Sequence, residues 1–286
     1  MTASNVQLIE CPRDAMQGIH PFIPTEVKVK YIQSLLNVGF DTLDFGSFVS
    51  PKAIPQMADT ASVLAQLDLS KTNSKLLAII GNTRGAQAAS EHQEIQYLGF
   101  PFSISNTFLQ RNINSSIEES FERLKRIQDI ALANNKDVVA YISMAFGNPY
   151  GDAWDAEVLM EWSEKLKDIG VGIISLSDTI GVSRPAIIDY LFSALIPALP
   201  EVTFGAHLHT TPDTWLEKVE AAYKAGCRRF DGALKGFGGC PMAKDDLTGN
   251  MPTENMVSYF NAQQINSGVD HDALMDSMAM VPEVFP

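Results

Sequence analysis

Two of the five histidines in this chain stand two residues apart, as His207 and His209, within the run V-T-F-G-A-H-L-H-T-T from Val202 to Thr211. The apolar and β-branched residues of this run predict a short buried strand. Because strand side chains alternate between faces, both imidazoles are expected to point the same way. Two imidazoles on one face can hold one metal ion. The alternative is that one histidine belongs to the core and the other to the surface.

A carboxylate and an amide elsewhere in the chain can complete such a metal centre. Asp14 together with His207 and His209 would supply one carboxylate and two imidazoles, a set that suits Fe²⁺, Mn²⁺ or Zn²⁺. An added amide oxygen, such as that of Asn250, shifts the preference to Mg²⁺ or Mn²⁺, the ions that we expect. Beside this centre, Arg13 would stabilise an oxyanion such as an enolate. The alternatives are a turn carboxylate for Asp14 and a surface ion pair for Arg13.

A cysteine in a glycine-rich segment is a third candidate for chemistry. Cys240 stands in the run G-G-C-P, where two glycines let the backbone approach a ligand closely. A thiol held there can donate or accept a proton, although a single cysteine is more often an inert small residue. Cys11 and Cys227 lie in apolar surroundings and are predicted to be structural.

Eight segments with the composition of strands alternate with helical patterns along the chain. This alternation predicts a parallel sheet, and eight units in 286 residues favour a (β/α)8 TIM barrel over an open doubly wound sheet. No G-x-G-x-x-G follows the first strand to support a dinucleotide-binding fold. The predicted strands are Asn5–Glu10, Asp41–Ser47, Lys75–Ile80, Ile95–Gly99, Asp137–Ser143, Val171–Ser177, Val202–Thr211 and Arg228–Ala233.

A single domain is expected over residues 1–286, because no long linker rich in Pro, Ser or Gly divides the chain. The part from about 250 to 286 has the pattern of closing helices and a tail. The clearest helix is Ser116–Asn134, where Ser116 and Glu119 form a capping box. Its apolar residues recur at helical spacing, which indicates core packing.

Two further helices are expected to have a proline near their first turn. Pro185 and Pro212 each precede a helical pattern, and proline is favoured in the first turn, where its missing N–H costs nothing. Ser183 and Thr211 are the predicted caps of these helices, because a hydroxyl can accept a hydrogen bond from the first free backbone N–H groups.

The candidate residues share one location in the predicted barrel. In TIM barrels the functional groups lie at the C-terminal ends of the strands and in the loops that follow. Arg13 and Asp14 follow the first predicted strand, Asp44 belongs to the second, and Asp178 follows the sixth. The two histidines end the seventh strand, and Cys240 follows the eighth. This common location is the physical argument for one active site.

Composition excludes some partners. A net charge of -13 disfavours nucleic acid and anionic membranes, so an anionic substrate must be met by a few placed cations. Three cysteines are too few for a disulfide framework, which indicates a reducing compartment, and we expect a cytoplasmic protein. We expect no export signal and no membrane span. The sequence leaves open whether the chain forms a homo-oligomer.

Six runs, in the same order over nearly the whole chain, resemble the 3-hydroxy-3-methylglutaryl-CoA lyases. These enzymes belong to a larger group of barrel metalloenzymes that make or break carbon–carbon bonds next to an acyl group. S-F-V-S-P-K together with G-G-C-P is the most specific part of the resemblance. The runs are C-P-R-D-A-M-Q (11–17), S-F-V-S-P-K-A-I-P-Q-M-A-D (47–59), N-I-N-S-S-I-E-E-S-F (112–121), L-S-D-T-I-G-V (176–182), H-L-H (207–209) and G-F-G-G-C-P (236–241).

The resemblance implies a TIM barrel with extra C-terminal helices, an acyl-CoA substrate and a reaction. The family uses Mg²⁺ or Mn²⁺ to split hydroxymethylglutaryl-CoA into acetoacetate and acetyl-CoA. By this resemblance Arg13 would neutralise the enolate of the departing acetyl-CoA, and Cys240 would take part in proton transfer. Asp178 would orient a ligand or Arg13, or else cap the following helix. The cation would be bound by Asp14, His207, His209 and Asn250.

The chain also departs from the family pattern. Asp44 stands where the family has a glutamate implicated in catalysis, Thr210 stands where an aspartate is usual, and Lys235 replaces a small residue. The spacing from Cys240 to Asn250 is one residue longer than usual. Two alternatives therefore stand beside the lyase. One is a related aldolase or Claisen-type synthase that acts on another 2-oxo or hydroxy acid, and the other is a non-catalytic descendant that binds metal or acyl-CoA.

Overall fold

Eight parallel strands close into a barrel in the computed structural model, which describes residues 6–239 and 248–285. Each strand pairs with the next barrel strand, and β9 pairs with β1 to close the ring. The predicted TIM barrel is therefore confirmed. The barrel strands are β1 (Gln7–Glu10), β2 (Thr42–Ser47), β3 (Lys75–Ile79), β4 (Ile95–Ser103), β5 (Asp137–Ser143), β6 (Ile173–Ser177), β7 (Thr203–His207) and β9 (Arg229–Gly232).

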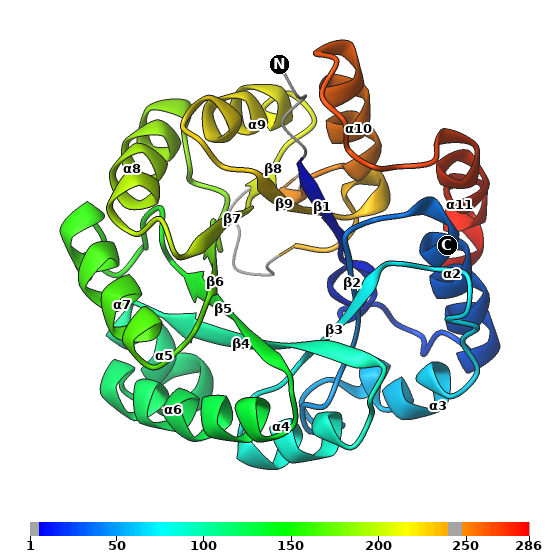
Figure 1. Ribbon diagram of the computed structural model, residues 1–286, viewed down its shortest axis with the longest axis horizontal. Helices are drawn as coiled ribbons and strands as arrows, with labels where there is room; N and C mark the ends of the chain where they lie inside the picture. Colours follow the sequence, from blue (N-terminus) through cyan, green and yellow to red (C-terminus); the bar gives the residue numbers. More distant parts are fainter. Residues whose placement is uncertain (1–5, 240–247, 286) are drawn as a thin grey trace.

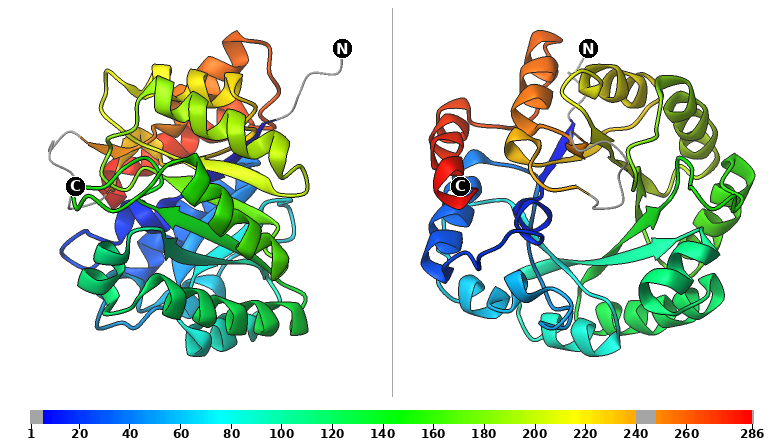
Figure 2. Two further views of the ribbon diagram at one scale, coloured as in Figure 1. Left: turned by 90° about the vertical axis from the view of Figure 1, so that its left-hand side faces the viewer. Right: turned by 180° about the vertical axis from the view of Figure 1, so that it is seen from behind.

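Helices surround the strands when the barrel is viewed from either end (Figure 1 and Figure 2). They are α1 (Pro12–Met16), α2 (Thr25–Val38), α3 (Thr60–Leu64), α4 (Thr83–Ser90), α5 (Asn106–Ile113), α6 (Ile117–Ala133), α7 (Ala156–Asp168), α8 (Pro185–Ala198), α9 (Trp215–Lys224), α10 (Thr253–Ala262) and α11 (His271–Val284), with short 3-10 turns η1 (Pro55–Met57) and η2 (Leu234–Gly236). In the described part of the chain, no helix is long and apolar enough to cross a membrane.

The expected extra helices are α10 and α11, which follow the last barrel strand. The helix α11 lies beside α2 on the outside of the barrel (Figure 1). The ring of Phe285, next to the end of α11, meets Tyr31 of α2 edge to face with 5.9 Å between centroids. The C-terminal segment thus covers an apolar face of α2.

The predicted helix starts at Ser116 and Pro185 are confirmed, whereas the predicted caps Ser183 and Thr211 are wrong. Ser116 and Glu119 form the predicted capping box at the start of α6. The α8 helix does begin at Pro185, but no side chain caps it, because the Ser183 hydroxyl donates instead to Asp178. The α9 helix begins at Trp215 rather than at Pro212, and the hydroxyl of Thr211 bonds with that of Thr214.

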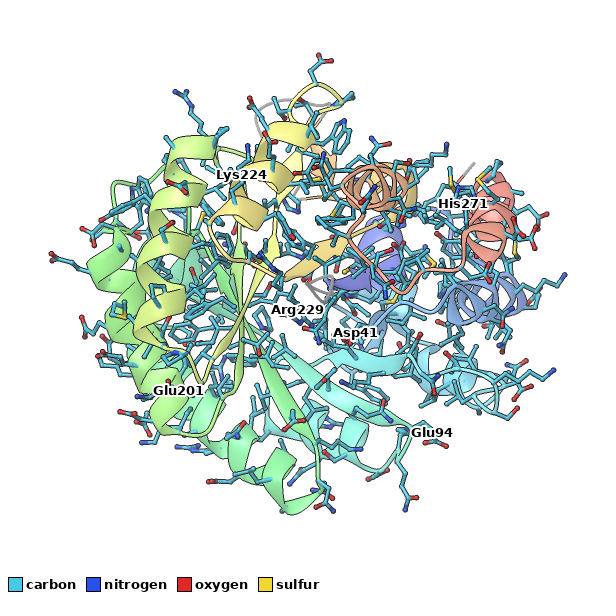
Figure 3. The ribbon with its side chains drawn as sticks, turned by 45° about the horizontal axis from the view of Figure 1, so that its top comes forward. Asp41, Glu94, Glu201, Lys224, Arg229 and His271 are labelled. Carbon is cyan, nitrogen blue, oxygen red and sulfur yellow. The ribbon has the colours of Figure 1, made fainter. Side chains whose placement is uncertain are left out.

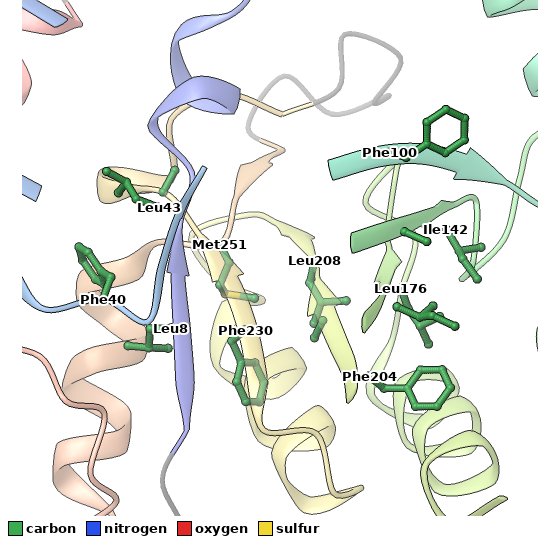
Figure 4. Close-up of a cluster of buried hydrophobic side chains, with 14 of the residues drawn as sticks. Leu8, Phe40, Leu43, Phe100, Ile142, Leu176, Phe204, Leu208, Phe230 and Met251 are labelled. Carbon is green, nitrogen blue, oxygen red and sulfur yellow. The ribbon is translucent and has the colours of Figure 1, made fainter. Parts of the chain in front are cut away.

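The main apolar core lies between the strands and the helices (Figure 4). Every second residue of a barrel strand points outward, so Leu8, Leu176, Phe204 and Phe230 are buried against the helices. The barrel interior also contains apolar side chains along β3, β4 and β5, including Leu77, Val139 and Tyr141. Strands buried on both faces explain the nearly continuous apolar runs of the sequence.

The barrel interior is polar where β6, β7 and β9 face it. The inward positions there are occupied by Ser175, His207, Arg229 and Asp231, and Gly205 leaves room among them. A Cβ on Gly205 would lie 3.2 Å from the Ser175 hydroxyl and 3.4 Å from the Arg229 side chain. One wall of the barrel is thus built from charged and hydrogen-bonding groups, and the candidate site lies on it.

A second, two-stranded sheet completes this wall. The strand β8 (His209–Thr210) pairs antiparallel with β10 (Gly249–Asn250), and His209 is directly opposite Asn250. The prediction of one strand over Val202–Thr211 is therefore corrected, since the barrel strand β7 ends at His207 and Leu208 separates it from β8. This break lets the segment after β7 leave the barrel and bring Asn250 beside the histidines.

Candidate active site

Asp14, His207 and His209 come together at the C-terminal mouth of the barrel. Asp14 lies in the short helix α1, directly after β1, and His207 is the last residue of β7. One ligand atom from each of the three residues lies within 4.8 Å of the other two. The histidine ring centroids are 5.5 Å apart, so the two imidazoles share a side although the strand breaks between them. The predicted trio thus has a spacing that one cation can bridge.

Hydrogen bonds on the far side of each ring decide which nitrogen faces the site. The Nδ1 of His209 lies 3.2 Å from the carbonyl oxygen of Thr179, which can only accept, so Nδ1 carries the proton. The Nδ1 of His207 lies 3.1 Å from a carboxylate oxygen of Asp231 and is protonated for the same reason. The buried Nε2 of His209 has no partner among the described residues. Both Nε2 lone pairs are thereby free for a cation, so the residues present fit a divalent metal.

Charge at the trio also suits a cation. Burial raises the pKa of Asp14, but the positive charges of Arg13, His207 and His209 outweigh burial and lower the pKa to about 2. Burial and the neighbouring His207 lower the pKa of His209. Burial lowers the pKa of His207 as well, but its hydrogen bond to Asp231 raises the pKa above its ordinary value. At neutral pH the site therefore presents an anionic carboxylate and a neutral His209.

Asn250 contacts this carboxylate directly. Its Nδ2 donates to Asp14 Oδ2 at 2.7 Å and to the carbonyl oxygen of Phe237 at 2.8 Å. Because both hydrogens of the amide are used, its oxygen is the atom left to act as an acceptor or ligand. Gln17 donates to the other oxygen of Asp14 at 2.7 Å. These two amides fix the carboxylate from both sides.

Arg13 lies between Asp14 and Asp44. Its Nη2 donates to Asp44 Oδ2 at 2.5 Å, and its Nη1 donates to Asp14 Oδ1 at 2.9 Å. Asp44 reaches the guanidinium although its side chain is one methylene shorter than a glutamate. Burial raises the pKa of Asp44 to about 6, against the lowering effect of Arg13. A permanently charged guanidinium is thus held beside Asp14.

Asp178 acts on the site through a lysine. Its carboxylate accepts hydrogen bonds from Ser183 and, at 3.1 Å, from Lys218 Nζ. The same Nζ donates to the carbonyl oxygen of His209 at 2.7 Å. Of the three roles that we expected for Asp178, these bonds are consistent with orienting a ligand, because none of them goes to Arg13 or to the first turn of α8. The Asp178–Lys218 pair fixes the backbone that carries His209.

The glycines before Cys240 pass against the site, whereas Cys240 itself lies outside the described residues. Gly238 has a positive φ of 87°, and a Cβ there would lie 2.7 Å from Asn250 Nδ2 and 2.8 Å from the carbonyl oxygen of Asp14. Only glycine allows this approach without a shift of its neighbours. A cavity of about 460 Å³ opens here and is lined by Asp14, Gln17 and Gly238, among others.

A larger hollow lies to one side of the trio. It has a volume of about 820 Å³ and includes Trp154, Arg184 and Lys218 in its lining. Of these, Lys218 is joined by a hydrogen bond to the segment that carries His209. Among the described residues, Asp14 is the member of the trio that borders the smaller cavity, and no member of the trio lines the larger hollow.

Thr210 and Lys235, two residues that depart from the family pattern, form hydrogen bonds with nearby residues. The buried Thr210 hydroxyl donates to the carbonyl oxygen of Thr211 at 3.0 Å. Lys235 has a positive φ of 60°, and its backbone N–H donates to Glu254 at 2.9 Å, while its side chain is exposed.

A second trio, Cys11, His207 and Asp231, shares one histidine with the first. A cation there would compete with the proton that joins His207 Nδ1 to Asp231. Burial also raises the pKa of the Cys11 thiol well above its ordinary value, which disfavours the thiolate that binds metals. The trio that contains Asp14 is therefore the better metal candidate.

Sequence reasoning missed Asp231, Arg229, Lys218 and Gln17. Arg229 and Asp231 stand two residues apart on a predicted strand, the same spacing that drew attention to the histidines. Gln17 follows Arg13 by four residues, one helical turn away. Lys218 carried no such signal, because its partners lie 9 and 40 residues away in the chain.

The chain is similar to a known family and to several of its named members. The model of the HMGL-like family matches residues 5–281. The chain is 34% identical to "Hydroxymethylglutaryl-CoA lyase, mitochondrial" of Gallus gallus, over 95% of this chain and 91% of the relative. It is also 34% identical to the "3-hydroxy-3-isohexenylglutaryl-CoA/hydroxy-methylglutaryl-CoA lyase" of Pseudomonas aeruginosa, over 95% of this chain and 90% of the relative.

A solved structure shows the same architecture. The HMG-CoA lyase of Acinetobacter baumannii, in complex with coenzyme A and 3-methylmalate, superposes with a TM-score of 0.89 at 30% identity. The match covers 99% of this chain and 93% of that one. The barrel and its added helices are therefore shared over their full length.

Proposed function

This chain belongs to the HMGL-like family, and we propose that it is a divalent-metal-dependent lyase that cleaves 3-hydroxy-3-methylglutaryl-CoA, or a close acyl-CoA, to acetoacetate and acetyl-CoA. The observation that carries the proposal is the Asp14, His207 and His209 trio with Arg13 beside it. The matches to relatives that are named as lyases cover 95% of this chain, which shows that this protein is an enzyme. The non-catalytic alternative is therefore not retained.

Asp14, His207 and His209 are the proposed protein ligands of the cation, with the amide oxygen of Asn250 as a further ligand. Two imidazoles with carboxylate and amide oxygens, and no thiolate, favour Mg²⁺ or Mn²⁺ over softer ions. When bound, such an ion supplies a Lewis acid that lowers the pKa of a hydroxyl and polarises a carbonyl. The chain's own contribution is to hold the ligand atoms in place through Gln17 and the Asp178–Lys218 pair.

Arg13 is proposed to stabilise the charge that develops in the reaction. A retro-Claisen cleavage transfers the proton of the tertiary hydroxyl to a base, and the electron pair left on oxygen forms the ketone of acetoacetate. The adjacent carbon–carbon bond breaks, and its electron pair leaves as the enolate of acetyl-CoA. The guanidinium, fixed by Asp44 and Asp14, is positioned to neutralise this enolate without reorganisation. Cys240, at the end of the glycine pair, is proposed to deliver the proton that converts the enolate into acetyl-CoA.

The P. aeruginosa relative supports a wider acyl group. Its name includes 3-hydroxy-3-isohexenylglutaryl-CoA, in which the methyl group is replaced by a longer apolar one. The cavity beside Asp14 also has Ile19, Ile54 and Phe237 in its lining. A panel of 3-alkyl-3-hydroxyglutaryl-CoA thioesters with increasing chain length would therefore define the acyl specificity of this chain.

The direct test is an assay of the purified protein with hydroxymethylglutaryl-CoA and Mg²⁺ or Mn²⁺, in which acetoacetate is followed. We expect acetoacetate that disappears when a chelator removes the metal and returns when the metal is restored. No acetoacetate with any divalent ion, while the protein still binds metal, would reject this substrate. Products from a panel of 2-oxo and hydroxy acids would then favour the aldolase or synthase alternative.

The cellular location and the oligomeric state of the protein stay predictions. A cytoplasmic location is expected from the cysteine content, whereas the relative from Gallus gallus is named as a mitochondrial protein. Fractionation of the native cells would decide between the two. Sedimentation of the purified chain would establish whether it forms the homo-oligomer that the sequence leaves open.

A further inference from the structure

We propose that Asp231 is a positioning residue that sets the tautomer of His207 and thereby makes its Nε2 a metal ligand. The inference rests on the proposed metal-dependent function, because it assigns His207 to the cation. Asp231 touches neither the proposed cation nor a substrate atom in this assignment, and it acts only through the imidazole.

The register of the barrel puts the two side chains together. His207 of β7 is directly opposite Asp231 of β9, so both side chains point into the barrel from neighbouring strands. One oxygen of Asp231 lies 3.1 Å from His207 Nδ1. The other oxygen accepts from Arg229 Nη1 at 2.9 Å. The Asp231 carboxylate thus links a permanent cation on one side to the imidazole on the other.

Burial makes this link specific. Asp231 and Arg229 are each only 2% exposed, and a buried carboxylate persists only where it is paired and hydrogen bonded. In Figure 3, Arg229 lies near the centre of the ring of strands, whereas Glu94 and Glu201 lie at its periphery. The ion pair between Arg229 and Asp231 is therefore buried and does not lie on the surface. Arg229 supplies the charge that keeps an acceptor-only carboxylate beneath the metal-binding trio.

An acceptor-only partner leaves one arrangement for the neutral imidazole. The proton must lie on Nδ1, where it bonds to Asp231, and the lone pair must lie on Nε2. The same ring is also fixed from the side by Tyr141, whose ring meets it edge to face with 5.6 Å between centroids. The orientation and the tautomer of His207 are thus set before any ion arrives, as for carboxylate–histidine–metal groups in general.

The substitution Asp231→Asn tests this logic with little change in volume. Arg229 Nη1 can only donate, so the amide oxygen of the asparagine should face Arg229 and its NH2 should face His207. The imidazole must then accept at Nδ1 and carry its proton on Nε2, where it blocks the metal. We expect the affinity for Mn²⁺ to fall about 10- to 100-fold. A proton on the wrong nitrogen is also the general effect of replacing the aspartate of a catalytic triad by asparagine.

The matched control is Asp41→Asn, the same chemical change at the opposite end of the barrel. Asp41 precedes β2 and accepts hydrogen bonds from Gln7 and Thr42. It lies at the N-terminal end of β2, whereas the trio lies at the C-terminal ends of the strands, and these hydrogen bonds do not involve His207. Its charge acts on Arg229 but not on the His207 ring, so the Mn²⁺ affinity of this variant should match that of the unchanged protein. A fall of similar size in both variants would assign the effect to lost charge in general and overturn the role of Asp231.

The experiment combines calorimetric titration of the metal-free proteins with Mn²⁺ and nitrogen-15 NMR of the His207 ring. In the unchanged metal-free protein, at a pH where the ring is neutral, we expect the proton on Nδ1. In Asp231→Asn we expect it on Nε2, together with the weaker Mn²⁺ binding. Unchanged Mn²⁺ affinity in a folded Asp231→Asn variant would overturn the inference.

The NMR measurement separates this inference from the proposed function and needs no variant. A proton on Nε2 of His207 in the unchanged protein would overturn the role of Asp231 even if Asp231→Asn failed to fold. If the unchanged protein has the Nδ1 proton but cleaves no acyl-CoA, the proposed substrate fails and the role of Asp231 stands.

Discussion

Arg13 is a charged side chain that three neighbouring side chains hold in place at the site. It is 8% exposed and bonded to Asp44, Asp14 and Gln17, so it cannot turn away from the trio when a substrate binds. Its flat guanidinium offers N–H groups in a fixed plane, which a lysine ammonium would not reproduce. A cation that is already in place when negative charge develops lowers the barrier without further rearrangement.

Arg13→Met tests this role at the level of a single residue. Loss of one oxyanion-stabilising group should lower kcat about 100- to 1000-fold. The affinity for Mn²⁺ should not fall, because the substitution removes a positive charge beside a cation site. Steady-state kinetics and metal titration on the same preparation check both statements. A variant that loses metal binding along with turnover would instead show that Arg13 mainly supports Asp14.

At the scale of elements, the site depends on the short pairing of β8 with β10. This pairing sets Asn250 opposite His209, and the Gly238-Gly239 segment passes directly over Asn250. The sequence predicted a single strand over Val202–Thr211, because its composition is uniform. The break at Leu208 could not be foreseen, since it depends on β10, a segment about 40 residues later in the chain.

Gly238→Ala should disturb this arrangement. The new methyl group would meet Asn250 Nδ2 and the Asp14 backbone at under 3.0 Å, and its positive φ adds backbone strain. We expect a loss of about 1 to 3 kcal/mol in the free energy of unfolding, with weaker Mn²⁺ binding. Chemical denaturation and metal titration are the measurements.

Gly18→Ala is the matched control for that substitution. Gly18 borders the same cavity, yet a Cβ there would meet nothing within 4 Å. Its stability and metal affinity should stay close to those of the unchanged protein. Equal losses in the two variants would contradict the close-approach argument at Gly238.

Glu10 joins three elements at the wall of the barrel. It ends β1, accepts a hydrogen bond from the backbone N–H of Leu234 in η2, and accepts another from the hydroxyl of Thr253 in α10. Burial is the largest influence on its pKa, which rises from 4.5 to about 8. The folded protein therefore favours the protonated acid.

This shift predicts a pH dependence of stability. An acid with a raised folded pKa stabilises the fold fully below its unfolded pKa, here 4.5, and loses that contribution as the pH rises through about 8. Glu10→Gln imitates the protonated form at every pH. It should therefore raise Tm relative to the unchanged protein above about pH 8, and the difference should shrink towards about pH 5. A difference in Tm that is the same at both pH values would contradict the shift.

Helix starts show the same limit of sequence reasoning. The capping box of α6 was predictable because Ser116 and Glu119 are three residues apart and partner each other. Ser183 was predicted as a cap, but it bonds to Asp178, whose position depends on Lys218 of another helix. Local pairs can be found from spacing alone, whereas pairs made by tertiary contact cannot.

At the scale of the whole molecule, closure of the barrel assembles the site. Asp14 follows β1, His207 ends β7 and His209 lies just beyond it, and these parts of the chain meet because β9 pairs with both strands. The alternation of eight strands and helices made this closure predictable, and with it the meeting of Asp14 with His207. The register that sets Asp231 opposite His207 was not predictable, because side-chain period alone does not fix register between parallel strands.

The central claim is that a divalent ion at Asp14, His207 and His209 supports cleavage of an acyl-CoA. The most direct measurement starts from metal-free protein and follows acetoacetate and acetyl-CoA while Mn²⁺ is added in steps to a solution with hydroxymethylglutaryl-CoA. We predict that both products appear in equal amounts and that the rate rises until one ion is bound per active chain. Full metal binding without either product would contradict the account.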